Sequence, residues 1–283
     1  MRKTLSIVLI ACLILALGLA AGCSKKTKQA APDKGAPEKQ ATEKLVVGAI
    51  GEPHTAMLKM VKSKLAEQGV EMEIKDFTEY SQLNPALNDK QIDANFFQHL
   101  PYLEDFNAER GTDLVSVAGI HIEPLGIYSK TLTNLDDVPD GAVVTIPNDA
   151  TNGGRALNLL AANALISLKA DAGFSATVAD IIDNPKNLKI TELEAAQLVR
   201  ALDDAALAVI NGNYALEGGL TPAKDALALE SAENNPYVNI LAVKRGNENL
   251  PAIQKLIALL TSPEVKAFIE EKYAGSVLPA FGN

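Results

Sequence analysis

Apolar and polar positions along the chain define short segments of two kinds. Segments that are apolar, or that alternate between apolar and charged side chains, are typical of strands, and they cover residues 44–50, 70–77, 92–96, 114–120, 142–147, 188–192, 206–210 and 237–243. Apolar side chains at helical spacing predict helices at residues 55–68, 81–89, 103–110, 155–168, 177–182, 195–202, 250–260 and 263–273. Up to residue 120 the two kinds alternate, which favours a parallel sheet with helices on both faces.

A break in this pattern at residues 121–128 indicates a crossing between two domains. Pro124 and Gly126 interrupt an otherwise extended run there, and a second alternating unit begins near residue 142. In open α/β sheets, ligands bind beyond the carboxyl ends of the strands. Residues 52–54 and 97–102 both follow predicted strands at that edge, so we expect both near a ligand site.

Residues 91–102 concentrate aromatic side chains. The chain has seven phenylalanines, six tyrosines and no tryptophan, and Phe96, Phe97 and Tyr102 all fall in this stretch together with His99. One interpretation is a core strand that runs into a turn and a helix, because clustered aromatic residues are usually buried. The other is the wall of a small-molecule pocket, because hydrogen-bonding side chains interleave with the rings.

The amino terminus has the features of a bacterial lipoprotein signal. A positive start precedes an apolar run over residues 5–21, which is typical of a secretory signal peptide. The letters LAAGC at residues 19–23 resemble the lipobox, in which the cysteine is acylated after cleavage. We therefore predict a signal peptide at residues 1–22 and lipidation at Cys23; the alternative is an ordinary cleaved signal in which Cys23 is incidental.

Residues 23–44 are predicted to form a lipid-anchored, flexible tether. They are rich in lysine, alanine, glutamine and proline, and such a composition cannot bury enough apolar surface to offset ordering. The second cysteine, Cys12, lies in the predicted signal. The mature chain would therefore contain no disulfide and no cysteine-based nucleophile or metal site.

Composition and motif searches exclude several classes of function. The chain has 283 residues, 47% of them apolar, and a net charge of −9, which argues against nucleic acid and anionic lipid as binding partners. It has neither a P-loop nor a nucleotide-binding glycine fingerprint. The three histidines, at positions 54, 99 and 121, do not pair at metal-ligand spacing. We therefore predict no enzyme activity, no cofactor and no metal.

Three polar positions suggest recognition of an amino acid. Arg155 opens a predicted helix after two glycines, where backbone amides and the helix dipole favour an anion and the guanidinium can fork onto a carboxylate. Asn211 follows a buried strand and Asn239 lies inside one, so each offers a carbonyl oxygen to an ammonium. The alternatives are a surface arginine, a turn asparagine and an asparagine with a partner in the core.

The body of the chain resembles the NlpA family of bacterial lipoproteins, whose members include the methionine-binding proteins of methionine ABC importers. The motifs that carry this resemblance are DANFFQHLPY at 93–102, NGGRAL at 152–157, AVIN at 208–211, GLTPAKD at 219–225 and PYVN at 236–239. It implies an α/β fold of the two-lobe, type II periplasmic-binding-protein kind, with the ligand cleft between the lobes. Lobe one is then residues 45–123 plus 240–283, and lobe two is residues 124–239.

The resemblance also implies a function and roles for individual residues. It implies a lipoprotein, anchored at Cys23 to a bacterial membrane and facing the periplasm or exterior, that captures L-methionine, D-methionine or a close analogue. Lobe closure, with hinges near residues 123–126 and 232–239, would precede delivery to a membrane permease and its ATPase. Arg155 would bind the carboxylate, Asn211 and Asn239 the rest of the head group, and the side-chain pocket would consist of Tyr80, Phe96, Phe97, His99 and Tyr102.

Two alternatives to methionine import stay open at this point. The same fold in another family member could take a different apolar amino acid or a dipeptide. A lipoprotein on the cell surface could also act as an adhesin or as the sensing subunit of a receptor.

Overall fold

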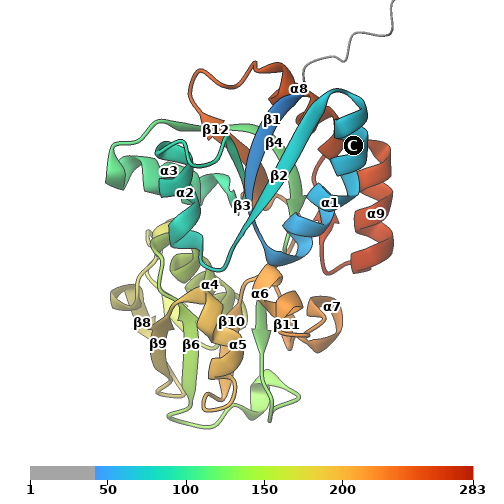
Figure 1. The fold of residues 1–283 in the computed structure, drawn as a ribbon. Helices are drawn as coiled ribbons and strands as arrows, with labels where there is room; N and C mark the ends of the chain where they lie inside the picture. Colours follow the sequence, from blue (N-terminus) through green and yellow to red (C-terminus); the bar gives the residue numbers. More distant parts are fainter. Residues whose placement is uncertain (1–41, 283) are drawn as a thin grey trace, which may run out of the picture. The chain divides into compact units, whose positions relative to one another are not determined.

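The computed structural model of the protein describes residues 42–282. The predicted signal peptide at 1–22, the predicted lipidation site Cys23 and the predicted tether up to residue 41 lie outside the described residues. None of the helices in residues 42–282 has both the length and the apolar content needed to cross a membrane. The described chain is built on two larger mixed sheets, one of six strands and one of five (Figure 1).

The six-stranded sheet has the order β13-β4-β12-β3-β1-β2. Its strands are β1 (Glu43–Ile50), β2 (Val70–Phe77), β3 (Ala94–His99), β4 (Leu114–Ile122), β12 (Val238–Lys244) and β13 (Leu278–Pro279). β1 pairs in parallel with β2 and β3, whereas β12 returns from late in the chain and inserts antiparallel between β3 and β4. The sheet is therefore mixed, and not parallel throughout as the local alternation predicts.

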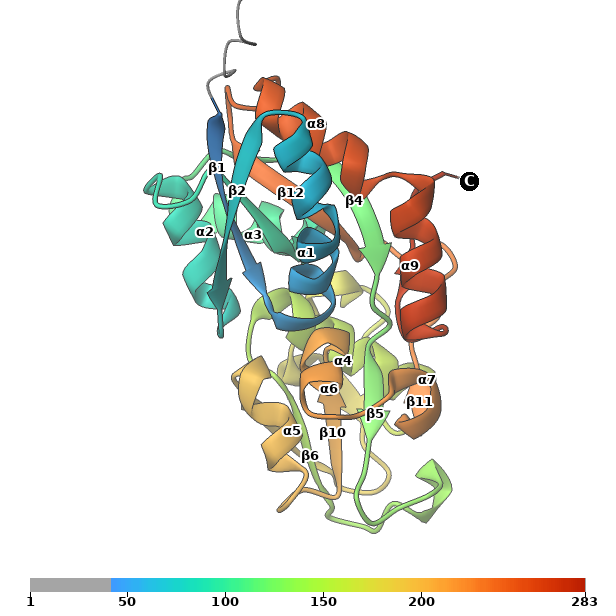
Figure 2. The ribbon, with the colours of Figure 1, turned by 45° about the vertical axis from the view of Figure 1, so that its right-hand side comes forward.

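Helices cover both faces of this sheet, because its central strands are apolar on both sides. One face packs on α1 (Gly51–Glu67), α8 (Pro251–Leu260) and α9 (Pro263–Tyr273). The other face packs on α2 (Tyr80–Asn88) and α3 (Leu100–Arg110). Figure 2 shows α1 and α9 on the same side of the sheet.

The five-stranded sheet has the order β11-β5-β10-β6-β9. Its strands are β5 (Gly126–Tyr128), β6 (Val143–Pro147), β9 (Lys189–Leu193), β10 (Leu207–Ile210) and β11 (Ala228–Leu229). One face packs on α4 (Ala150–Ala162), and the other packs on α5 (Leu198–Ala201) and α6 (Gly212–Glu217). The remaining elements are α7 (Pro222–Asp225), a small sheet of β7 (Ser167–Leu168) and β8 (Ile181–Asp183), and the 3₁₀ turns Leu135–Asp137, Gly173–Ser175, Val178–Asp180 and Ala195–Gln197.

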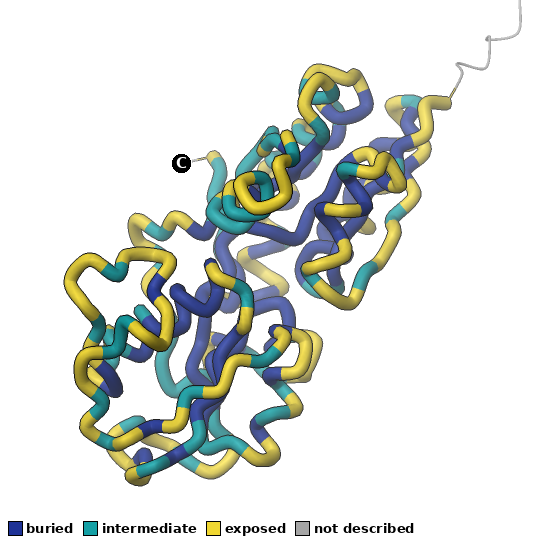
Figure 3. Tube along the Cα trace, turned by 90° about the vertical axis from the view of Figure 1, so that its left-hand side faces the viewer, coloured by how far each residue is buried: buried dark blue, intermediate teal, exposed yellow. Residues whose placement is uncertain are grey.

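Two connections run between the six-stranded sheet and the five-stranded sheet. Residues 123–125 link β4 to β5, and residues 230–237 link β11 to β12. An apolar cluster includes Ile50, Leu83 and Phe97 from the first sheet and its helix together with Ile210 and Tyr214 from the second. In Figure 3 the strands are mostly buried, while exposed positions gather on the turns and on the outer sides of the helices. Side chains from both sheets therefore pack together in this shared cluster.

Most predicted elements agree with the structure, and three differ. The first strand begins at Glu43, so the last residues of the predicted tether belong to the sheet. Residues 177–182 form a 3₁₀ turn and a short strand instead of a helix. The helix predicted at 155–168 is α4, which begins at Ala150 and ends at Ala162, because Asp149 caps it by accepting a hydrogen bond from the Asn152 backbone N–H at 2.9 Å.

Gly153 and Gly154 consequently lie inside α4 and do not form an anion-binding loop in front of it. Their role is packing. A Cβ atom on Gly154 would lie 2.3 Å from the carbonyl oxygen of Phe174 and 2.9 Å from the backbone nitrogen of Ala176. Glycine is therefore required here by the close approach of the 173–176 segment and not by a positive φ angle.

Replacing Gly154 by alanine is expected to lower the free energy of unfolding by about 1–3 kcal/mol, because an extra methyl group has no room against backbone atoms. Urea denaturation measures the change. Ala162→Ser, at an exposed position of the same helix, is the control and should stay within about 0.5 kcal/mol of the wild type. An unchanged midpoint for Gly154→Ala would mean that the 173–176 segment moves aside without cost.

Candidate functional site

A small cavity lies where the carboxyl ends of strands from both sheets meet. The space between atoms there, open solvent at its mouth included, is about 330 Å³. It is lined by Tyr80, Phe97, Gln98, His99, Tyr102, Glu123, Asn152, Arg155, Asn211, Gly212, Asn213 and Asn239. All the site residues predicted from the sequence border this cavity except Phe96, and the lipidation site lies outside the described residues.

Phe96 is a correction to the predicted site. The pairing of β3 with β12 is irregular at Phe97, and Phe97, Gln98 and His99 all border the cavity, whereas Phe96 points to the other face of the sheet. Phe96 is fully buried in the core under α1, α8 and α9. Its ring packs edge-on against the imidazoles of His54 and His121, with ring centroids 4.8 and 5.3 Å apart.

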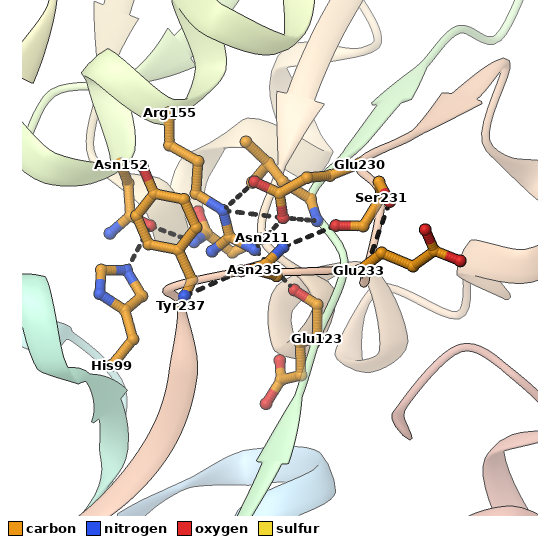
Figure 4. Close-up of polar contacts among 11 residues, drawn as sticks. His99, Glu123, Asn152, Arg155, Asn211, Glu230, Ser231, Glu233, Asn235 and Tyr237 are labelled. Atoms are coloured by element: carbon orange, nitrogen blue, oxygen red, sulfur yellow. Dashed lines mark hydrogen bonds and ion pairs between the residues drawn. The ribbon is translucent and has the colours of Figure 1, made fainter. Parts of the chain in front are cut away.

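Arg155 is held rigidly in the wall of the cavity (Figure 4). Its side chain is 3% exposed and pairs with Glu230, whose carboxylate oxygens accept hydrogen bonds from Nε at 2.9 and 3.1 Å. Nη2 donates to the backbone oxygen of Glu123 at 2.8 Å, and the guanidinium lies over the ring of Tyr237, 4.3 Å from its centroid. None of the hydrogen bonds among residues 42–282 uses Nη1, so this edge of the fork is available to a carboxylate.

A chain of amides next to Arg155 leaves one acceptor without a partner. Asn152 Nδ2 donates to the Asp149 carboxylate at 3.0 Å. This bond orients the Asn152 amide so that Asn152 Oδ1 points toward Asn211 and His99. That oxygen accepts from Asn211 Nδ2 at 2.9 Å and from His99 Nε2–H at 3.1 Å. Asn211 Oδ1 then remains buried and unpartnered, and such an atom is costly unless a ligand or water donates to it.

His99 is neutral in this arrangement. Its Nδ1 accepts the Tyr102 backbone N–H at 3.2 Å, so the proton lies on Nε2, which donates to Asn152. Burial lowers the pKa of His99 to about 3, and the Arg155 guanidinium acts in the same direction. The imidazole therefore works as a fixed hydrogen-bond donor that orients the amides.

Aromatic rings form the opposite wall of the cavity. The centroid of Phe97 lies 5.8 Å from those of both Tyr80 and Tyr102, and Tyr80 and Tyr102 are 6.1 Å apart. The Tyr80 hydroxyl donates to Asn213 Oδ1. Burial raises the pKa of both tyrosines, so their hydroxyl groups stay neutral. This wall offers apolar contact to a side chain, and aromatic rings also contact sulfur favourably.

Sequence reasoning missed several cavity residues, above all Glu123. The side chain of Glu123 is 6% exposed, and its Oε1 lies 2.6 Å from His121 Nε2 and 3.3 Å from His54 Nε2. The three groups offer atoms within 4.8 Å of one another, although the two histidines are far apart in the sequence. An acid between the apolar residues Ile122 and Pro124 is the available signal, whereas the proline and glycine of residues 121–128 predict only a crossing between domains. Gln98, Asn152, Gly212 and Asn213 were also missed.

Comparison with known proteins identifies relatives of the whole described body. The model of the NlpA lipoprotein family matches residues 45–281. The chain is 41% identical to the methionine-binding lipoprotein MetQ of Bacillus subtilis, covering 84% of this chain and 88% of that one. It is 42% identical to the D-methionine-binding lipoprotein MetQ of Escherichia coli, covering 83% and 86%. A nutrient binding protein from Burkholderia cenocepacia, solved bound to methionine, is 44% identical with a TM-score of 0.80, covering 84% of this chain and all of that one.

Proposed function

This chain belongs to the NlpA lipoprotein family, and from that membership we propose that it is the substrate-binding lipoprotein of an ABC importer that captures methionine. It would deliver the amino acid to a membrane permease that is driven by an ATPase. Relatives named as methionine-binding lipoproteins, and one solved with methionine, support the choice of ligand. The two-sheet architecture supports a two-lobe, type II binding-protein fold.

The observation that carries the proposal is the distribution of charge around one small cavity. The Arg155 guanidinium reaches it from α4 and the Glu123 carboxylate from the end of β4, and the three rings lie on another wall. A zwitterionic amino acid needs a cation for its carboxylate, an anion or carbonyl oxygens for its ammonium, and an apolar slot for its side chain. We assign the carboxylate to Arg155 and the ammonium to Glu123, Asn211 and Asn239.

The proposal extends to how the protein moves and where it is anchored. The lobes would be residues 45–123 plus 240–283 and residues 124–239, closing about the two connections near 123–126 and 232–239. The chemistry would be reversible binding, because the cavity presents no nucleophile next to a base. Membership of a lipoprotein family and the lipobox-like residues 19–23 support a lipid anchor at Cys23 in the cell envelope.

A thermal-shift panel of the common amino acids, including both enantiomers of methionine, tests the ligand. Methionine at 100 times its dissociation constant is expected to add about 2.7 kcal/mol to the free energy of unfolding, which raises the midpoint visibly. The protein must first be stripped of bound ligand by partial unfolding and refolding. A flat response to methionine together with a shift from another amino acid would overturn the ligand assignment.

A further inference from the structure

Two histidines and a glutamate form a buried polar cluster against the cavity. His54 lies in the first turn of α1, His121 near the end of β4, and Glu123 in the connection that follows β4. They are 1%, 0% and 5% exposed. Glu123 and the neighbouring Asn239 both line the cavity, so a change in charge within the cluster is felt by a bound ligand.

With the Asn239 amide oriented as in the structure, the contacts of His54 place a proton on each of its ring nitrogens. Nδ1 lies 3.1 Å from the backbone oxygen of Ile50, and a carbonyl oxygen only accepts, so Nδ1 must donate. Nε2 lies 2.9 Å from Asn239 Oδ1 and 3.3 Å from Glu123 Oε1, which are also acceptors. A neutral imidazole carries only one N–H, so with Asn239 Oδ1 facing Nε2 the imidazolium is the form that donates to both Ile50 and Asn239 and pairs with Glu123.

His121 differs from His54 in this respect. Its Nε2 lies 2.6 Å from Glu123 Oε1, while its Nδ1 is buried and has no hydrogen-bond partner. One proton, on Nε2, is therefore enough for His121, and burial lowers its pKa to about 3. The cluster thus combines one neutral donor, one carboxylate and one histidine that is placed to hold an extra proton.

We propose that His54 holds a proton beside the Glu123 carboxylate before the ligand arrives, and that the ammonium group of the amino acid replaces this proton. The inference rests on the proposed function, since the ammonium would come from the bound amino acid. One positive charge enters next to Glu123 as the ammonium, and one leaves as the Nε2 proton of His54, which passes to solvent. Amino-acid capture therefore releases about one proton.

Asn239 provides the hydrogen-bond partner that this exchange requires. With the proton on His54, Asn239 Oδ1 accepts from Nε2. After the proton leaves, Nε2 has a lone pair, and a half-turn of the amide brings Nδ2 to donate to it. The same half-turn frees Oδ1 to accept from the ammonium in the cavity, so deprotonation and ligand recognition use one motion.

Other titratable groups near the cluster influence how strongly it holds a proton. Those that face it from further elements are Arg155 of α4, Glu217 of α6, Tyr80 of α2 and Tyr273 of α9. Burial lowers the pKa of His54 and the Glu123 carboxylate acts against this shift, while burial raises the pKa of Glu123. An ammonium beside Glu123 adds a like charge near His54, which lowers the pKa of His54 further.

The sign of the pH dependence follows from this proton inventory. The free protein binds one more proton than the complex at pH values below the pKa of His54. The association constant for methionine is then expected to rise with pH by up to about tenfold per unit in that range, and to become constant above it. The α-ammonium of the ligand keeps its charge, because α-amino groups titrate near pH 8 or above.

Calorimetric titration of the protein with L-methionine in two buffers of different ionisation enthalpy, such as phosphate and imidazole, counts the protons. Because burial lowers the pKa of His54 from its ordinary value of 6.5, we expect proton release below pH 6.5, increasing toward acidic pH and declining as the pH rises. Binding heat without any dependence on the buffer would overturn the proton exchange and leave the proposed function intact. Absence of any methionine binding would overturn both.

Two histidine variants locate the proton. His54→Gln is expected to abolish proton release and to flatten the pH dependence of the association constant. His121→Gln is expected to keep the release, because glutamine still donates one hydrogen bond to Glu123. Release that persists in His54→Gln would place the proton on Glu123 and overturn the assignment to His54. Thermal unfolding checks that each variant folds, and the wild-type proton count decides the main question independently of them.

Discussion

Replacing Arg155 by alanine is expected to weaken methionine binding by about 100- to 1,000-fold, because truncating one partner of a buried, hydrogen-bonded charge pair typically costs several kcal/mol. The guanidinium is the cation we assign to the ligand carboxylate, and its side chain is 3% exposed. Bonds to Glu230 and to the Glu123 backbone, with the ring of Tyr237 beneath it, hold the fork in place. Little conformational entropy is therefore lost when the ligand binds.

Two further arginine variants separate this role from general effects. Arg155→Lys keeps a charge but loses the planar fork, so its affinity should lie between those of the wild type and Arg155→Ala. Arg200→Ala removes an exposed arginine of α5 and should leave the affinity unchanged. Isothermal titration calorimetry with L-methionine measures all three, after thermal unfolding has shown that they fold. Wild-type affinity in Arg155→Ala would mean that another group binds the carboxylate.

Local sequence patterns were sufficient for most of the elements. The strand at residues 70–77 and the helix at 263–273 have the predicted bounds, because alternation and helical spacing are properties of each segment alone. The start of α4 was not predictable in the same way. The two glycines favour a loop over a helix, but Asp149 caps α4 in front of them and the close packing of the 173–176 segment on Gly154 accounts for a glycine inside the helix.

The hydrogen-bond and ion-pair partners of the site residues were even less predictable from local sequence patterns than the start of α4. Arg155 could be selected from the sequence as a cation at a helix start, but its partner Glu230 lies 75 residues further on. His54 and Glu123 meet because β1 and β4 lie in one sheet with β12 between β4 and β3, and this order depends on a strand from the end of the chain. Spacing rules for short motifs therefore could not find the buried cluster.

Phe96 is the one predicted pocket residue that does not border the cavity. The predicted strand ends at residue 96 and leaves the direction of Phe97 open, whereas in the structure β3 continues to His99 with an irregular register at Phe97. The structure divides the two phenylalanines between two clusters: Phe96 lies in the core beneath α1, and Phe97 lies in the cluster shared by both sheets. The two rings should consequently have different roles.

We expect Phe96→Ala to lower the free energy of unfolding by about 3–5 kcal/mol, the range for removing a fully buried aromatic ring. The ring has no exposed surface, and it packs edge-on against His54 and His121. The midpoint of thermal unfolding should fall by roughly 6–20 °C, given about 2–4 °C per kcal/mol for a protein of this size. Differential scanning calorimetry of the ligand-stripped protein measures the change.

Phe97→Ala is the matched variant, because it removes the same ring from the next position of the same strand. Phe97 borders the cavity and contacts Tyr80 and Tyr102, so its loss should weaken methionine binding by about tenfold or more, as expected for an apolar contact of 1.4 kcal/mol or greater. The order of the two effects should therefore reverse, with the larger loss of stability at Phe96 and the larger loss of affinity at Phe97. A larger loss of affinity at Phe96, measured on folded protein, would return that ring to the binding site and contradict the division of the strand into a core face and a ligand face.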